Sequence, residues 1–222
     1  FNCGYKPLAN SETQTLTQTP KFYYGAHQSQ IKSISVAATV AASSSSDDTI
    51  KLYDLATSTE LVSVILHSSS PTTTTFFSSS ATPTSTVSFQ TNLLAGSNDG
   101  NVHIFDVDPF VLLKSVKVHK KSVNDITVHP SGRVALTVAR DSRLAMVNLV
   151  RGKKSYCSRI EKEADIVEYF GDSGSKFFMC AGENVTVHNS EDSRLCGEFF
   201  ATKRVLCAAP GEVWSGVCIV FI

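Results

Sequence analysis

The chain has 222 residues, 20 basic and 20 acidic residues, and a hydrophobic fraction of 42%. This length suits one domain, and the hydrophobic fraction is enough for a core, which excludes a globally disordered protein. The zero net charge excludes a protein that holds nucleic acid or an anionic membrane mainly through bulk electrostatics, while a local basic patch stays compatible with it. The apolar run at 217–222 is far too short to span a bilayer, so we expect no membrane partner.

Two further counts concern the ends of the chain and its metal-binding capacity. The chain begins with Phe1, and its two methionines are Met146 and Met179, so we expect a piece of a longer protein. The six cysteines contain no C-x2-C pair, and the six histidines match no zinc-binding spacing. The sequence therefore predicts no metal and no cofactor.

A short segment recurs along the chain with a fixed internal pattern. In each copy an Asp stands seven positions before a closing Asp or Asn, and apolar residues lie four and two positions before that closing residue. Three clear copies span 47–54, 99–106 and 141–148, and a weaker fourth copy ends at Asn189. The closing residues at 54, 106, 148 and 189 are separated by 52, 42 and 41 positions. Such a period is typical of repeat architectures.

Each repeat divides into about four short runs in which apolar and polar residues alternate. In the clearest repeat these runs are 123–128, 133–138, 143–148 and 154–160. Alternation over four to eight residues between turn residues predicts strands. Four short strands in about 40–45 residues are typical of a β-propeller blade, so the sequence predicts an all-β, incomplete propeller of about four four-stranded blades.

The expected propeller occupies residues 1–222 as one partial domain. Its blades are expected at about 27–66, 67–118, 119–160 and 161–200, with a truncated or divergent start of a further blade at 201–222. Ser or Thr fills 14 of the 19 positions in 68–86. The few apolar residues of this stretch bury too little surface to offset the conformational entropy lost on folding. We therefore expect 68–86 to be a flexible insertion in the second blade.

The repeat resembles the WD-repeat, which has Gly-His near its start, Asp in the turn before the third strand, and a closing Trp-Asp. The Gly-His position is filled by His27, loosely by His67, and by His119. A buried carboxylate needs hydrogen-bond donors, so we expect His27 to pair with Asp47 and His119 with Asp141. The residues with expected structural roles in the repeat are His27, Asp47, Tyr53, Asp54, Asp99, Phe105, Asp106, His119, Asp141 and Asn148.

Ser, His and Asp residues near one another also invite interpretation as the catalytic residues of a hydrolase. Each has a position in the repeat that explains it, so we expect no enzyme and no small-molecule substrate. Residues 171–176 lack the phosphate-loop pattern and are expected to form a hairpin turn. The carboxylates of Glu161, Glu163, Asp165 and Glu168 are expected on a solvated edge rather than in an acid–base pair.

A closer resemblance covers most of the chain. Residues 118–138 and 144–152 are similar to the third blade of the p21-activated kinase (PAK)-interacting protein 1 family, and residues 46–54 and 203–205 match that family in the same order. The resemblance implies a nuclear and nucleolar scaffold that matures the large ribosomal subunit, with pre-ribosomal proteins and ribosomal RNA as partners. It also implies, as an alternative, a negative regulator that binds a p21-activated kinase.

A substrate receptor of a cullin-type ubiquitin ligase is a further alternative. Such receptors carry Arg two positions after the closing Asp, where this chain has Ala56, Asp108 and Val150. This departure disfavours the third function.

Five basic residues fall in or beside loops that share one face of a WD-repeat propeller: Lys120, Lys121, Arg140, Lys203 and Arg204. Together they would form a partner-binding patch for ribosomal RNA or an acidic protein segment. The alternative is ordinary solvated surface, and Glu161 and Glu163 interrupt the patch between blades.

Overall fold

The protein is seen in a computed structural model that describes residues 25–67, 69–78, 92–170 and 173–208. Within these ranges, sixteen strands form four antiparallel sheets of four strands each. This arrangement confirms the all-β fold and the four blades of an incomplete propeller. No helix in the described ranges has the length and apolar character needed to cross a membrane.

In each sheet the strands lie side by side in chain order. Blade 1 contains β1 (Ile31–Ala37), β2 (Val40–Ser45), β3 (Thr49–Asp54) and β4 (Thr59–Ile65). Blade 2 contains β5 (Pro71–Phe77), β6 (Asn92–Ser97), β7 (Asn101–Val107) and β8 (Phe110–Lys117). Blade 3 contains β9 (Val123–Val128), β10 (Val134–Ala139), β11 (Arg143–Asn148) and β12 (Lys153–Arg159). Blade 4 contains β13 (Ile166–Phe170), β14 (Lys176–Ala181), β15 (Asn184–Asn189) and β16 (Leu195–Phe200).

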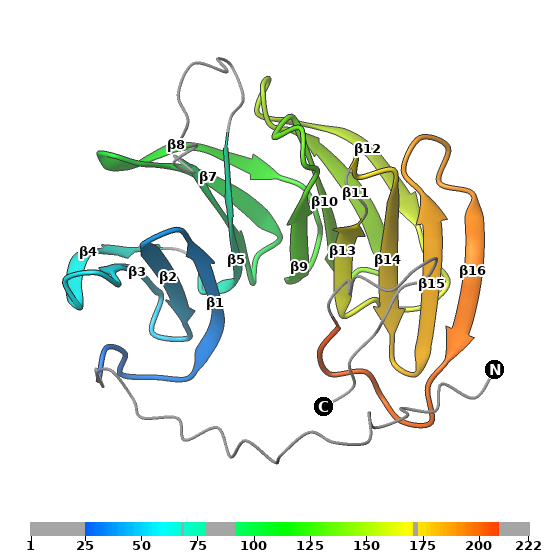
Figure 1. Cartoon of the computed structure of the whole chain (residues 1–222), viewed down its shortest axis with the longest axis horizontal. Helices are drawn as coiled ribbons and strands as arrows, with labels where there is room; N and C mark the ends of the chain where they lie inside the picture. The colour runs from blue at the N-terminus through cyan, green and yellow to red at the C-terminus, as the bar shows by residue number, and fades with distance from the viewer. Residues whose placement is uncertain (1–24, 68, 79–91, 171–172, 209–222) are drawn as a thin grey trace, which may run out of the picture.

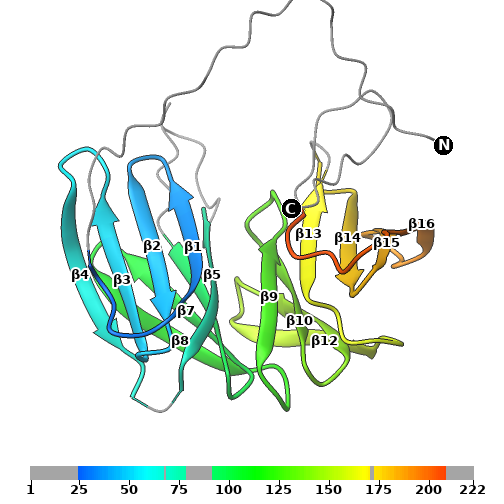
Figure 2. The same cartoon turned by 90° about the horizontal axis from the view of Figure 1, so that it is seen from below.

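The four blades follow one another around an arc, with the first strand of each blade nearest the middle (Figure 1). These inner strands are β1, β5, β9 and β13, and each contacts the inner strand of the next blade. Figure 2 shows the same order from a perpendicular direction, with blades 1 and 2 on one side and blades 3 and 4 on the other. The loops of each blade therefore gather at the two ends of its strands, on opposite faces of the arc.

Part of the Ser/Thr-rich stretch is a core strand. Residues 71–77 form β5, in which Thr73, Thr74, Phe76 and Phe77 are buried. The expected flexible insertion was wrong for this part, because β-branched Thr favours strands and its small side chain fits between two packed sheets. Residues 79–86 of the expected insertion lie outside the described residues.

The core lies in layers between consecutive blades. Between blades 1 and 2, Ile50 and Leu52 pack with Leu93 and Phe105, which are almost completely buried. A second layer joins blades 2 and 3, and a third joins blades 3 and 4 around Phe177. Blades 2 and 3 thus bury both of their faces against neighbouring blades, and blades 1 and 4 bury one face each, as in other repeat architectures.

Polar side chains on each inner strand hydrogen-bond to the backbone of the next inner strand. These bonds join residues 41 or 42 positions apart, which is the repeat period. The N–H groups of Thr74 and Phe76 donate to the hydroxyls of Ser33 and Ser35 at 3.1 and 3.2 Å, and those of Val167 and Tyr169 donate to Asp125 and Thr127 at 3.0 and 3.2 Å. Between blades 2 and 3, the Thr72 hydroxyl donates to the carbonyl of Val123 at 2.7 Å.

The segment after β16 follows the path of a link between blades. The N–H of Val205 donates to the carbonyl of Gly182 at 2.8 Å, much as the N–H of Val118 donates to Gly100 at 3.1 Å. Val205 and Val118 are both buried. Residues 201–208 contain no strand, and the rest of the further blade expected at 201–222 lies outside the described residues.

Gly100 provides a test of how tightly the turn between β6 and β7 packs against the loop before β9. Gly100 has φ of +85°, and a Cβ there would meet the carbonyl oxygen of His119 and, at 2.6 Å, that of Lys121. We predict that Gly100→Ala lowers the free energy of unfolding by about 3 kcal/mol, because backbone strain and a clash with backbone atoms add together. Denaturant unfolding followed by circular dichroism measures this change.

Gly182→Ala is the matched control. Gly182 has a similar φ of +65°, but a Cβ there would meet nothing within 4 Å. Backbone strain alone should cost about 1 kcal/mol. Equal losses in the two variants would contradict the close packing of the blade 3 loop on Gly100.

Candidate functional site

A hydrogen-bond network in blade 1 joins the segment before β1 to the turn between β2 and β3. His27 Nδ1 lies 3.0 Å from Asp47 Oδ2, and His27 Nε2 lies 2.6 Å from the Ser43 hydroxyl. The Ser43 hydroxyl donates to that of Tyr53 at 3.2 Å, and Asp47 accepts the N–H of Gln28 at 3.0 Å. The structure thus brings His27, Asp47 and Tyr53 together, as the repeat pattern suggested.

The Asp47 carboxylate is held in its ionised form. Burial opposes ionisation, but hydrogen bonds from Thr49, Gln28 and His27 outweigh it and hold the pKa of Asp47 well below its usual range. The charged carboxylate therefore fixes the turn between β2 and β3 as well as the segment that leads into β1.

Blade 3 contains the same arrangement. His119 Nδ1 lies 3.1 Å from Asp141 Oδ1, and Nε2 lies 2.8 Å from the Thr137 hydroxyl. Burial lowers the pKa of His119, although the charge of Asp141 opposes this effect. The imidazole is therefore neutral near pH 7, with Nδ1–H donating to Asp141 and Nε2 accepting from Thr137. Asp141 also accepts the N–H of Lys120 at 2.9 Å, which fixes the loop before β9.

Blade 2 uses a different histidine. His67 is exposed, so the loose assignment of the Gly-His position to His67 was wrong. Instead, His103 on β7 lies between two hydroxyls, with Nε2 3.1 Å from Ser97 and Nδ1 2.8 Å from Ser115. Ser97 donates to Asp99 at 2.5 Å. The repeat pattern places its histidine before the first strand of a blade, so it did not indicate His103. The available signal was a His in an inward-facing strand position four residues after the turn Asp.

The closing residues cap the turns between the third and fourth strands. The side-chain oxygen of each accepts an N–H two or three residues further on, an arrangement that suits Asp and Asn. These bonds are Asp54 with Ala56 at 2.7 Å, Asp106 with Asp108 at 3.3 Å, Asn148 with Arg151 at 2.8 Å and Asn189 with Glu191 at 2.8 Å. Beside Asp106, the fully buried Phe105 ring stacks on Phe110 with centroids 5.2 Å apart.

The Ser43–His27–Asp47 arrangement has the connectivity of a hydrolase triad. Ser43 is only 5% exposed to solvent, and its hydroxyl donates to the hydroxyl of Tyr53. The Ser43 hydroxyl and the His27 imidazole are both engaged in bonds that hold the turn and the segment before β1 in place. The geometry therefore suits a structural clamp.

Three residues of the expected patch lie close together on the loops of blade 3. Lys120 and Lys121 lie before β9, and Arg140 follows β10 directly. The N–H of Arg140 donates to the carbonyl of Ser122 at 2.9 Å, which joins the two loops. All three side chains are exposed, and the ion pairs of the described ranges include none of them. We call Lys120, Lys121 and Arg140 the top basic cluster.

Lys203 and Arg204 lie beside blade 4, in a more acidic surrounding. Nη2 of Arg204 lies 3.0 Å from each of the two carboxylate oxygens of Asp165. A shallow cavity there is also lined by Glu163 and Glu183. The structure therefore separates the expected patch into a basic part on blade 3 and a largely neutralised part on blade 4.

Two carboxylates on neighbouring inner strands are perturbed. Burial raises the pKa of Asp125 to about 6, and burial together with the charge of Asp125 raises the pKa of Glu168 to about 7. The expectation of a solvated edge was wrong for Glu168, because its strand β13 packs against β9. Glu161 and Glu163 are exposed, as expected.

Comparison with known proteins identifies a repeat family that matches two parts of the chain, and several proteins with similar sequences. The family described as "WD domain, G-beta repeat" matches residues 18–54 and 110–146. The chain is 28% identical over 204 residues to "p21-activated protein kinase-interacting protein 1-like" of Danio rerio, covering 92% of this chain and 52% of that protein. It is 25% identical over 205 residues to "Protein MAK11" of Saccharomyces cerevisiae, covering 89% and 50%.

A third relative is "Shk1 kinase-binding protein 15" of Schizosaccharomyces pombe, which is 30% identical over 135 residues, covering 60% of this chain and 37% of that protein. The chain spans about half the length of the first two relatives.

The network of blade 2 gives a stability prediction. Asp99 accepts bonds from the Ser97 hydroxyl and from the N–H and side-chain amide of Asn101. Asp99→Ala removes this shared acceptor from the turn, so we predict a loss of about 1–3 kcal/mol in the free energy of unfolding. Thermal and denaturant unfolding measure it. The exposed Glu161→Ala is the control and should unfold like the parent, and unchanged unfolding of Asp99→Ala would refute the structural role.

The inner-strand carboxylates give a prediction about pH. The raised pKa of Glu168 means that the folded protein holds this proton more tightly than the unfolded chain, whose Glu has a pKa near 4.5. Ionisation therefore penalises the folded state, and this penalty is complete above about pH 7 and disappears as the pH falls below about 4.5.

We predict that Glu168→Gln raises the free energy of unfolding by about 1 kcal/mol at about pH 8 and has no such effect near pH 4. Urea unfolding at the two pH values, with the exposed Glu161→Gln as control, checks this. A variant whose stability keeps the parent's pH dependence over this range would contradict the prediction.

Proposed function

Because the chain is a WD-repeat protein that resembles the p21-activated protein kinase-interacting protein 1-like family, we propose that it is a non-catalytic scaffold for maturation of the large ribosomal subunit in the nucleus and nucleolus. Propellers bind partners through surface loops held on a rigid framework rather than through a reactive pocket. The partners in this proposal are pre-ribosomal proteins and ribosomal RNA.

The top basic cluster is the observation that carries this proposal. Its three side chains are exposed and lie on two loops that hydrogen bonds hold together. Lys and Arg on fixed loops suit phosphate groups, because contacts with phosphates fix the position of a protein on RNA and release bound counterions. An acidic segment of a pre-ribosomal protein satisfies the same electrostatic requirement.

The buried network of blade 3 holds the loop that carries Lys120 and Lys121 in place. The Asp141 carboxylate accepts hydrogen bonds from the His119 imidazole and from the N–H of Lys120. The loop that carries Lys120 is therefore tied to the core of blade 3. A preorganised surface loses less entropy on binding than a flexible one. The clamp residues therefore serve binding indirectly, by positioning the cluster.

A kinase-binding regulator is the second candidate function. Two relatives carry names that refer to kinase binding, the Danio rerio protein and the Schizosaccharomyces pombe protein. Such a function would use the same scaffold architecture. Affinity purification of the tagged protein separates the two: pre-ribosomal particles favour the scaffold, and a p21-activated kinase without them favours the regulator.

Charge reversal of the top basic cluster tests the first function. We predict that the triple variant Lys120→Glu, Lys121→Glu, Arg140→Glu loses association with large-subunit precursors by about tenfold or more, because three phosphate contacts are replaced by repulsion. Sucrose-gradient sedimentation of cell extracts measures the association, and circular dichroism verifies the fold.

The matched control reverses three exposed charges on the opposite face, at Lys153, Lys176 and Arg194. This variant has the same net charge as the first and should retain the association. Equal behaviour of both triple variants would sink the proposed role of the cluster.

A further inference from the structure

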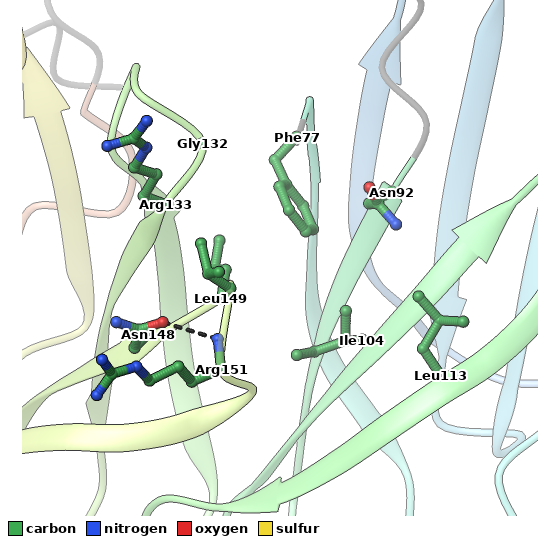
Figure 3. A pocket seen from close by; sticks show the side chains of 10 residues that line it. Phe77, Asn92, Ile104, Leu113, Gly132, Arg133, Asn148, Leu149 and Arg151 are labelled. Carbon is green, nitrogen blue, oxygen red and sulfur yellow. Dashed lines mark hydrogen bonds between the residues drawn. The ribbon is translucent and has the colours of Figure 1, made fainter. Parts of the chain in front are cut away.

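A groove lies between blades 2 and 3 on the face opposite the top basic cluster (Figure 3). Arg133 in its lining and Arg140 in the cluster stand at opposite ends of β10. The cavity has a volume of about 570 Å³, which is within the range of sites that bind small molecules or a few side chains of a peptide. Both walls belong to described blades.

The walls of the groove are mainly apolar. Phe77 and Ile104 form its buried floor on the side of blade 2, with exposures of 5% and 6%. Leu149 faces them from the turn after β11 (Figure 3). Leu113 and Val150 also line the groove, and they are 54% and 76% exposed. A single exposed Leu or Val is ordinary on a protein surface, but here they border a hollow that already has an apolar floor.

The charged side chains in the lining of this groove have one sign. Arg133 and Arg151 belong to its lining and are exposed, and no Asp or Glu does. Lys114 adds a third cation, since its Nζ donates to the carbonyl of Arg151 at 3.3 Å. The adjoining turn of blade 2 carries two carboxylates, those of Asp106, which accepts the N–H of Asp108, and of the exposed Asp108 itself, and neither residue belongs to the lining. An apolar floor with a basic rim is complementary to an apolar anchor with acidic neighbours.

We propose that this groove binds an acidic segment of a partner protein. One aliphatic or aromatic side chain of the segment lies between Leu113 and Leu149, and flanking carboxylates pair with Arg133 and Arg151. The inference goes beyond the proposed function, because the site is on the opposite face from the top basic cluster. One molecule is then able to hold a polyanion on one face and an acidic protein segment on the other.

The composition of the groove favours a peptide over RNA. Single-stranded RNA binds proteins largely by stacking its bases on exposed aromatic faces. The one aromatic ring in the lining, Phe77, is almost completely buried, and the exposed lining consists of aliphatic and Arg side chains. Aliphatic walls accept a Leu or Phe side chain without this requirement.

Fluorescence anisotropy with labelled synthetic peptides tests the site. The probe is a ten-residue peptide with a Leu-Phe centre and flanking glutamates, and the control peptide has lysines in place of the glutamates. We expect the acidic peptide to bind and the basic one not to bind. The double variant Arg133→Glu, Arg151→Glu should weaken binding by about tenfold or more, and the exposed Leu113→Ser by about fivefold.

Arg194→Glu is the matched control, since Arg194 is exposed and lies in the corresponding hairpin of blade 4 on the same face. It should change the affinity by less than about twofold. Circular dichroism of each variant shows that the fold is retained. The top basic cluster variant should bind the peptide normally, so failure of this site and failure of the proposed function are distinguishable.

Three outcomes overturn the inference. The first is equal binding of the two peptides, or binding that the double variant leaves unchanged. The second is displacement of the acidic peptide by a single-stranded RNA oligonucleotide in the parent but not in the double variant, which assigns the groove to nucleic acid. The third is a dimer in analytical ultracentrifugation that the double variant abolishes, which assigns the groove to a second copy of this chain.

Discussion

The hydrogen bonds between successive inner strands are the constraint on which the rest of this structure depends. The inner strand of each blade is a sheet edge, so every second backbone N–H along it has no partner in its own sheet. Ser35 and Thr127 supply acceptors for such groups on the next blade, at Phe76 and Tyr169. Buried donors without partners would cost about 1–3 kcal/mol each, so short polar side chains are required at these positions. They also fix the distance between blades, which allows the apolar layers to pack.

This constraint at the centre explains the features at the periphery. Because the inner strands are joined, blades 2 and 3 meet mainly along β5 and β9, whereas their outer strands β8 and β12 contact each other much less. Between blades 2 and 3, Phe77 and Ile104 fill the inner part of the wedge, and Leu113 on β8 is left exposed. The groove is thus a consequence of propeller geometry, and the Arg residues on its rim are what distinguish it from a plain packing defect.

The sequence predicted the local features of this fold well and its contacts between blades less well. The runs predicted at 123–128 and 143–148 coincide with β9 and β11, because alternation and turn residues are local signals. β5 was missed because its Thr residues do not look apolar, yet their methyl groups and hydroxyls suit a buried inner strand. His103 and Glu168 were misread for a related reason: burial by a neighbouring blade decides their roles. Similarly, only folding brings Leu113 and Leu149 to one groove.

Although the net charge of the chain is zero, its basic and acidic side chains are concentrated on different blades. Arg204 is paired with Asp165, and Glu163 and Glu183 line the same surface of blade 4. A polyanion that approaches the top face is therefore attracted by blade 3 and repelled by the neighbouring carboxylates of blade 4. Opposite charges side by side restrict the orientation of a partner more than a uniform basic face does. Zero net charge in this protein reflects segregated charges rather than an absence of electrostatic recognition, and the basic rim of the groove on the other face extends the same principle.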